Sequence, residues 1–293
     1  MDILIADKLA TWQTEADDRF NTLKANEEEL NRIFAEIYGL QDEVPIEVPD
    51  NKVTVRRADL QREIRSLVSY AIGCVFGRYS LDKDGLILAN QGDTIAEYIT
   101  LIPSQSFMPS VNNCIPVLQG DWFEDSAVIQ FKRFLVAAYG EDTFDENLLF
   151  VENALGKSIN SYFVKDFYND HIKIYKKRPI YWLFSSPKKS FNTLIYMHRY
   201  TENTVSEILS QYLRPFRDKL NMRIQTLRAS STTTGTTEAD KLQNTVQELE
   251  GWERDVIYPM ANDHIRIDLD DGVKVNYNKF PNALRKVTGL SEW

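Results

Sequence analysis

The amino-acid sequence predicts a mainly α-helical protein of the α+β class, with long antiparallel helices and two small β-hairpins. Three patterns support this prediction: apolar residues at helical spacing in several long segments, a pair of aromatic and β-branched segments between residues 179 and 200, and a pair of alternating segments between residues 265 and 277. The chain has 293 residues, of which 43% are hydrophobic and 12% aromatic. A chain of this size and composition can bury a substantial core.

The longest helical pattern covers residues 3–38, where apolar residues recur every three or four positions and Gly39 supplies a stop. Asn26 and Glu29 resemble an N-cap pair, so a second helix that begins at Asn26 is the alternative. The stretch 41–55 contains two prolines and alternating valines, which indicates an extended connector.

A further helix is predicted over residues 58–76, with Gly73 and Gly77 four residues apart on one face. Such a pair lets another part of the chain approach closely, so we interpret it as tight packing in a core. Residues 82–121 are rich in Gly, Pro, Asn and Ser, which predicts a long loop region.

The second half of the chain also has a mainly helical pattern. The segments with helical spacing are residues 122–139, 145–155, 158–168, 204–228 and 238–260. A Ser/Thr/Gly-rich linker, Ala229–Thr237, separates the last two segments and predicts a flexible connection within an antiparallel helical hairpin. We expect an N-terminal helical region with a long loop over residues 1–121 and a domain over residues 122–293, with one continuous domain as the alternative.

Two β-hairpins are predicted. The segments PIYWLFSS and FNTLIYMHRY are separated by PKKS, and Asp271-Gly272 joins two alternating halves in IRIDLDDGVKVNY. In the first hairpin, Tyr181 and Leu183 face one side of a strand while Trp182 and Phe184 face the other. Because both sides are apolar, we expect this strand to be covered on both faces.

The motifs of common nucleotide, cofactor and metal sites are absent from the sequence. Gly156-Lys157-Ser158 lacks the first glycine of a P-loop, no G-x-G-x-x-G follows a predicted strand, and the Asn/Asp-Pro-Pro-aromatic loop of amino-methyltransferases is missing. The three histidines have no zinc-ligand spacing, and the acidic turn at 268–271 lacks the distal Glu of a calcium loop. The sequence therefore predicts no catalytic, cofactor-binding or metal-binding residue in this chain.

Cysteine usage and hydropathy predict a soluble, cytoplasmic protein. Cys74 and Cys114 have no C-x-x-C spacing, so two reduced thiols are expected, with a single disulfide as the alternative. The N-terminus lacks the basic region and the apolar stretch of a signal peptide. The longest apolar run, Leu67–Phe76, is too short to span a bilayer.

Charge is distributed unevenly along the chain. The formal net charge is −9, with 34 basic and 43 acidic residues, yet the window His171–Tyr200 contains no Asp or Glu. Positive charge interleaved with aromatic rings is typical of nucleic-acid-binding surfaces. The window holds seven cations and seven aromatic residues, namely Lys173, Lys176, Lys177, Arg178, Lys188, Lys189 and Arg199, and Tyr175, Tyr181, Trp182, Phe184, Phe191, Tyr196 and Tyr200.

Within this window the rings and the cations have different expected roles. The strand alternation places most of the rings in the core, whereas the cations before the first strand and in the turn are costly to bury. We therefore expect phosphate contacts, which position duplex DNA without reading its sequence. The candidate residues are Lys176, Lys177, Arg178, Lys188, Lys189 and Arg199.

Five long segments also follow one another in the order found in a known family. They are Leu23–Val44, Ala58–Leu86, Phe123–Gly156, Lys173–Thr204 and Arg266–Phe280. These segments resemble the C-terminal part of PglX, the adenine-specific DNA methyltransferase family of BREX phage-defence systems, whose members are similar to large type IIG-like enzymes. The resemblance spans most of the chain.

The resemblance implies that the intact enzyme uses S-adenosylmethionine to methylate the exocyclic amine of adenine in a short DNA site, marking host DNA as self. The methyltransferase core is not in this sequence, so no catalytic or S-adenosylmethionine residue carries over. The linker Ala229–Thr237 also looks shorter and less charged than the lysine-rich helix of the family, which argues against basic contacts there. We expect a non-catalytic portion that helps clamp duplex DNA. The alternative is a structural or protein-interaction module that braces the methyltransferase core or other defence components without DNA contact. The expected partners are duplex DNA, the remaining methyltransferase and target-recognition regions and other phage-defence proteins.

Overall fold

The computed structural model describes residues 3–230 and 232–293. The chain forms two compact units, Met1–Leu67 with Tyr139–Gly156, and Val68–Ala138 with Lys157–Trp293. This division differs from the predicted boundary at residue 121, because the second unit continues through that position.

The first unit is built on one long helix, α1 (Ile5–Tyr38), so no second helix begins at Asn26. Gly39 ends α1 with φ 67°, a left-handed conformation that glycine adopts without steric cost. The helix α5 (Phe144–Leu155) secures the start of α1 through Asn147. The Asn147 side chain accepts a hydrogen bond from the backbone N–H of Ile5 at 2.8 Å and donates one to the carbonyl of Ile3 at 2.9 Å.

The connector after α1 runs back along the helix, as an extended segment with a short 3₁₀ turn at Asp50–Lys52. Phe20, Val48 and Val53 form a small core between helix and connector. Side chains of α1 pair with the returning segment in reverse order of sequence: Asn31 with Ile46, Glu28 with Val48, Lys24 with Asp50, and Asp17 with Arg57. The predicted extended connector is thus confirmed.

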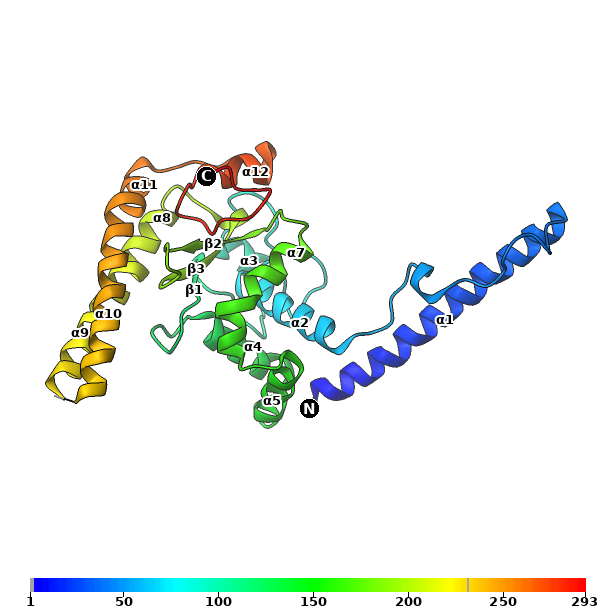
Figure 1. Cartoon of the computed structure of the whole chain (residues 1–293), viewed down its shortest axis with the longest axis horizontal. Helices are drawn as coiled ribbons and strands as arrows, with labels where there is room; N and C mark the ends of the chain where they lie inside the picture. The colour runs from blue at the N-terminus through cyan, green and yellow to red at the C-terminus, as the bar shows by residue number, and fades with distance from the viewer. Residues whose placement is uncertain (1–2, 231) are drawn as a thin grey trace. The chain divides into compact units, whose positions relative to one another are not determined.

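The second unit is centred on a three-stranded antiparallel sheet in the order β1-β3-β2 (Figure 1). The strands are β1 (Cys114–Pro116), β2 (Tyr181–Ser185) and β3 (Asn192–Tyr196). Tyr181 pairs with Tyr196 and Ser185 with Asn192, which confirms the first predicted hairpin. The predicted loop region 82–121 contains β1 and also a short helix, α3 (Ile95–Leu101), which the sequence pattern did not indicate.

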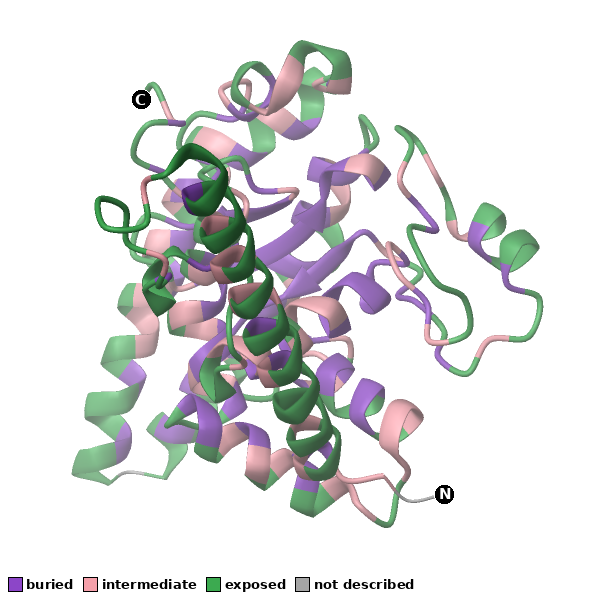
Figure 2. Ribbon diagram, turned by 90° about the vertical axis from the view of Figure 1, so that its right-hand side faces the viewer, coloured by how far each residue is buried: buried purple, intermediate pink, exposed green. Residues whose placement is uncertain are grey.

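Both faces of this sheet are covered, as predicted, and Figure 2 shows the strands buried throughout. On one face, Tyr181 stacks on Phe76 and on His171. On the other face, Trp182 contacts the rings of Tyr277 and Phe280. The sheet is therefore the centre of the core and the rigid support for the turn between β2 and β3.

Helices surround the sheet. Their bounds are α2 (Leu60–Val75), α4 (Ala127–Tyr139), α6 (Ile159–Tyr162), α7 (Tyr168–Ile174), α8 (Thr204–Glu207), α9 (Arg214–Ala229), α10 (Thr233–Trp252) and α11 (Tyr258–Asp263). Three π-helical turns join consecutive helices, at Phe163–Phe167, Ile208–Leu213 and Glu253–Ile257. At Gly73 in α2, a Cβ atom would lie 2.3 Å from the Tyr79 ring, which confirms the predicted close packing there. Cys74 and Cys114 are both free and buried, as expected from their spacing.

The predicted helical hairpin is formed by α9 and α10, which lie side by side (Figure 1). Arg223 pairs with Glu238 near the connection, and Arg214 pairs with Glu253 at the far end, so the helices are antiparallel. The linker between them is much shorter than predicted, because α10 already begins at Thr233. Ser231 of the predicted linker lies outside the described residues.

The prediction of a second β-hairpin, over residues 265–277, is wrong. Residues Leu269–Asp271 form a 3₁₀ turn and Gly272–Tyr277 form a short helix, α12. Local side chains take the backbone hydrogen bonds that a strand partner would need: the Asp268 carboxylate accepts from Asp270 N–H, and the Asn276 amide bridges Asp268 and Gly272. Within the described residues, no helix combines the length and apolar character needed to cross a bilayer.

Candidate nucleic-acid interface

The first group of candidate cations lies in the turn that ends α7. Lys176 and Lys177 have φ angles of 49° and 64°, and the N–H of Lys177 donates to the carbonyl of Ile172 at 2.8 Å. This left-handed turn closes the C-terminus of the helix and leaves the side chains of Lys176, Lys177 and Arg178 exposed. Cations at a helix C-terminus are also favoured by the helix dipole.

The second group lies in the turn between β2 and β3. Lys189 has φ 62° and donates its N–H to the carbonyl of Ser186 at 2.8 Å. The N–H of Lys188 donates to the carboxylate of Glu248 on α10 at 2.9 Å. These two hydrogen bonds hold the backbone of the turn in place, while the side chains of Lys188 and Lys189 are exposed.

Arg199, the remaining candidate, does not belong to this surface. It is 6% exposed, and its guanidinium donates to the carbonyls of Phe76, Ser110 and Val111 at 2.8–3.2 Å. Burial lowers the pKa of Arg199 to about 10. Its hydrogen-bonding capacity serves the interior of the unit, so we remove Arg199 from the candidate phosphate contacts.

The aromatic residues of the window are core residues, as the strand alternation predicted. Six of the seven are buried: Tyr181, Trp182, Phe184, Phe191, Tyr196 and Tyr200. Only Tyr175 is half-buried. Because these rings pack on one another and on the helices, they are not available as platforms on which bases stack.

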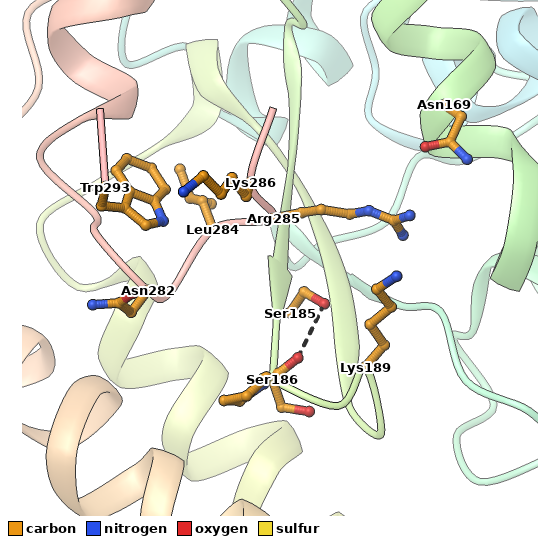
Figure 3. Close-up of a pocket in the computed structure, with 10 residues that line it drawn as sticks. Asn169, Ser185, Ser186, Lys189, Asn282, Leu284, Arg285, Lys286 and Trp293 are labelled. Atoms are coloured by element: carbon orange, nitrogen blue, oxygen red, sulfur yellow. Dashed lines mark hydrogen bonds between the residues drawn. The ribbon is translucent and has the colours of Figure 1, made fainter. Parts of the chain in front are cut away.

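A cavity of about 480 Å³ opens beside the β2–β3 turn and adds two cations that sequence reasoning missed. Arg285 and Lys286 line it together with Lys189 (Figure 3). They reach the sheet because residues 283–285 run along β2: Ser185 N–H donates to the Ala283 carbonyl and Arg285 N–H to the Leu183 carbonyl. The only signal in the sequence was the adjacent basic pair, which lies outside the cation-rich window.

None of the seven cations at these two turns and the cavity forms an ion pair with a described residue; six of them are exposed and Arg285 is half-buried. The seven cations are Lys176, Lys177, Arg178, Lys188, Lys189, Arg285 and Lys286. By contrast, the arginines of α9 pair with carboxylates of α10 and beyond. Both groups border the same C-terminal segment, since Lys189 lines the cavity with Arg285 and a Cβ on Gly289 would lie 3.6 Å from Lys177 Nζ.

This arrangement presents positive charge on turns whose backbones are held by hydrogen bonds. Across residues 3–230 and 232–293, no cluster of three or more His, Cys, Asp or Glu side chains is placed to hold a metal ion. Unpaired ammonium and guanidinium groups on anchored turns are suited to binding phosphate oxygens.

Comparison with known proteins gives the context of this surface. No protein-family model matches the chain. The chain is 42% identical over 294 residues to the adenine-specific methyltransferase PglX of Lacticaseibacillus casei (strain Zhang), which covers 92% of this chain and 23% of that protein. It is 33% identical over 324 residues to the adenine-specific methyltransferase BrxX of Escherichia coli O9:H4 (strain HS), which covers 98% of this chain and 27% of that protein.

The chain is homologous to part of these methyltransferases. It spans about a quarter of the length of these two relatives. The matches run through nearly the whole chain. This homology is consistent with the C-terminal portion that the resemblance to PglX predicted.

Proposed function

We propose that this chain is a non-catalytic, C-terminal portion of an adenine-specific DNA methyltransferase of a phage-defence system of the BREX type, and that it helps hold duplex DNA through the phosphate backbone. In the intact enzyme, S-adenosylmethionine would bind to the methyltransferase core, outside this chain. The observation that carries the proposal is the set of exposed, unpaired cations on anchored turns in a chain of net charge −9.

The charge distribution favours an oriented contact. A protein with excess negative charge is repelled by a polyanion except where cations gather, so DNA would approach by the two turns. The five turn cations are Lys176, Lys177, Arg178, Lys188 and Lys189. Because the rings of the same window are buried, the contact would position the duplex and leave base reading to another region.

The test is the salt dependence of duplex binding. Each phosphate neutralised contributes about −0.9 to the slope of log K against log salt. Replacing Lys176, Lys177 and Arg178 together with Gln should weaken binding of a duplex oligonucleotide and reduce the steepness of that slope by up to about 2.7. Fluorescence anisotropy over a range of salt concentrations measures both quantities.

A matched control removes the same charge elsewhere. Lys8, Lys52 and Arg56 are exposed, lie in the first unit and form no ion pair with a described residue. Their replacement with Gln should leave the slope unchanged, with at most a small uniform loss of affinity. Equal slopes in the wild type and in the Lys176/Lys177/Arg178 variant would refute backbone contact by the α7 turn.

A second candidate function rests on a different observation. The C-terminal half of α1 exposes a stripe of large apolar side chains at positions i, i+3, i+4, i+7 and i+8: Leu30, Ile33, Phe34, Ile37 and Tyr38, with exposed fractions of 39–70%. Such a stripe favours docking onto another protein surface. In this alternative the chain braces the rest of the methyltransferase without touching DNA.

A further inference from the structure

We infer that the cavity between the β2–β3 turn and the C-terminal segment binds a nucleotide, with the phosphate at its Lys189–Arg285 end and the base near Trp293. The ligand class is a nucleoside phosphate, either free or as one unit of a nucleic-acid strand. This binding requires none of the three cations of the α7 turn.

The first support is the charge of the cavity wall. Three of the ten lining residues are cations, and none is acidic. In Figure 3 the guanidinium of Arg285 and the ammonium of Lys189 extend toward the same side, where Asn169 also lies. A guanidinium binds two phosphate oxygens at once, and a lysine beside it adds a point charge.

Ser186, which also lines the cavity, supplies a hydroxyl group. Ser186 is 2% exposed, and its Oγ accepts a hydrogen bond from the N–H of Phe191 at 3.1 Å. Its own O–H has no acceptor among the described residues, so it is free to donate to a phosphate oxygen. By contrast, the hydroxyl of Ser185 already donates to Asn192 at 2.7 Å.

The opposite end supplies an aromatic surface. Trp293, Lys286 and Asn282 lie there in Figure 3. The Trp293 ring stacks on Tyr277, with centroids 5.9 Å apart and an angle of 12° between the planes, which fixes the orientation of the indole. Trp293 is half-buried and lines the cavity, so a base could stack against its accessible part.

The size of the cavity agrees with this ligand. At about 480 Å³ it lies within the range of roughly 300–1,000 Å³ that is usual for small-molecule sites. It is much larger than a single phosphate ion requires, and in Figure 3 Lys189 and Arg285 extend toward one side of it while Trp293 lies on the other. A phosphate joined to a sugar and a base has one group suited to the cations and another suited to the indole.

Calorimetric titration of the full chain with deoxyadenosine 5′-monophosphate, deoxycytidine 5′-monophosphate and deoxyadenosine tests this inference. We expect both monophosphates to bind, because stacking tolerates either base, and deoxyadenosine to bind at least about tenfold more weakly, because it lacks the phosphate. If neither monophosphate binds at millimolar concentration, the inference is overturned.

Variants separate the two ends of the cavity. Arg285→Gln and Trp293→Ala should each weaken binding of the monophosphates about tenfold or more. Arg56→Gln, a neutralised exposed arginine of the first unit, should have no effect. Circular dichroism and the melting temperature establish that each variant is folded, and unchanged affinity in folded Arg285→Gln would contradict the assignment.

Competition identifies the source of the nucleotide. If a single-stranded oligonucleotide displaces the monophosphate and binds with higher affinity than it, the cavity holds one unit of a strand. If the oligonucleotide binds more weakly than the monophosphate, the cavity holds a free nucleotide. Both outcomes support the site. The Lys176/Lys177/Arg178→Gln variant should bind the monophosphates as the wild type does. Loss of its duplex affinity alone would support backbone contact, so the two proposals can fail separately.

Discussion

At the residue scale, the sequence identified which cations are present but could not tell surface from interior in every case. Lys188 and Lys189 were placed correctly because a turn residue with a charged side chain has no inexpensive buried position. Arg199 was misplaced because its partners, the carbonyls of Phe76, Ser110 and Val111, are more than eighty residues away along the chain. No local pattern reports such distant acceptors.

His171 shows how strongly the core around the sheet constrains a titratable group. It is 1% exposed, and its Nε2 accepts a hydrogen bond from the N–H of Tyr181 at 3.1 Å, which requires a neutral ring protonated at Nδ1. The rings of Phe167, Tyr175 and Tyr181 lie around it. Burial, with a smaller contribution from the charge of Arg78, lowers the pKa of His171 to about 3.

This lowered pKa predicts a loss of stability in acid. The unfolded chain takes up a proton on His171 below its ordinary pKa of 6.5, whereas the folded chain does so only near pH 3. The contribution of His171 to the free energy of unfolding is therefore complete above pH 6.5 and declines as the pH falls toward 3, by up to about 1.4 kcal/mol per pH unit. In urea unfolding at pH 7 and pH 5, His171→Gln should lose less stability between the two pH values than the wild type, by up to about 2 kcal/mol.

Protonation of carboxylates in acid also lowers stability, but this loss is common to the wild type and to His171→Gln and therefore cancels in that comparison. Equal losses in the wild type and in His171→Gln would show that His171 is not buried in its neutral form. His198, whose pKa burial lowers to about 4, titrates over a similar range in both proteins and also cancels.

At the scale of helices and strands, an element was predicted correctly where the packing of the folded chain requires the same residue pattern that the sequence shows. The β2–β3 hairpin was correct because apolar residues on both faces of a strand are stable only in a covered sheet. The C-terminal hairpin was wrong because Asp-Gly is compatible with more than one local structure, and the side chains of Asp268 and Asn276 stabilise a 3₁₀ turn and a helix instead. The short strand β1 was missed because three residues are too few to show alternation.

The connection between α9 and α10 is a second case in which composition was misleading. Ser and Thr suggested flexibility, yet Thr232 is the N-cap of α10, and its Oγ1 accepts a hydrogen bond from Gly235 N–H at 3.1 Å. The turn is also tight, because a Cβ on Gly235 would lie 2.8 Å from the side-chain oxygens of Ser230 and Thr232.

We therefore predict that Thr232→Ala destabilises the helical hairpin by about 1 kcal/mol, the usual cost of losing an N-cap side chain. Thr232→Ser keeps the hydroxyl group and should retain most of the wild-type stability. Chemical unfolding followed by circular dichroism measures both differences. If the two variants unfold at the same denaturant concentration as the wild type, the cap does not contribute, and the connection behaves as the flexible linker that its composition suggested.

At the scale of the whole molecule, the two units were not predictable from composition, because each is assembled from separated parts of the chain. The extension of the first unit to Tyr139–Gly156 depends on Asn147, whose bonds to Ile3 and Ile5 join positions more than 140 residues apart. The apolar spacing of α1 correctly predicted a helix, and among the described residues no internal partner covers Leu30, Phe34 and Ile37.

That stripe predicts an association between this chain and the rest of a methyltransferase of the same kind. Burying a large apolar side chain contributes about 1.5–3 kcal/mol, so replacing Leu30, Phe34 and Ile37 with Gln should weaken such an association more than tenfold. The partner to use is the portion of the Lacticaseibacillus casei PglX that this chain does not match, expressed separately and measured by surface plasmon resonance. The control replaces three other exposed apolar residues, Leu149, Met222 and Val275, with Gln and should leave the affinity unchanged. Equal loss of affinity in both triple variants would mean that α1 has no specific role, and undiminished affinity in the α1 variant would leave duplex DNA as the better-supported partner of this chain.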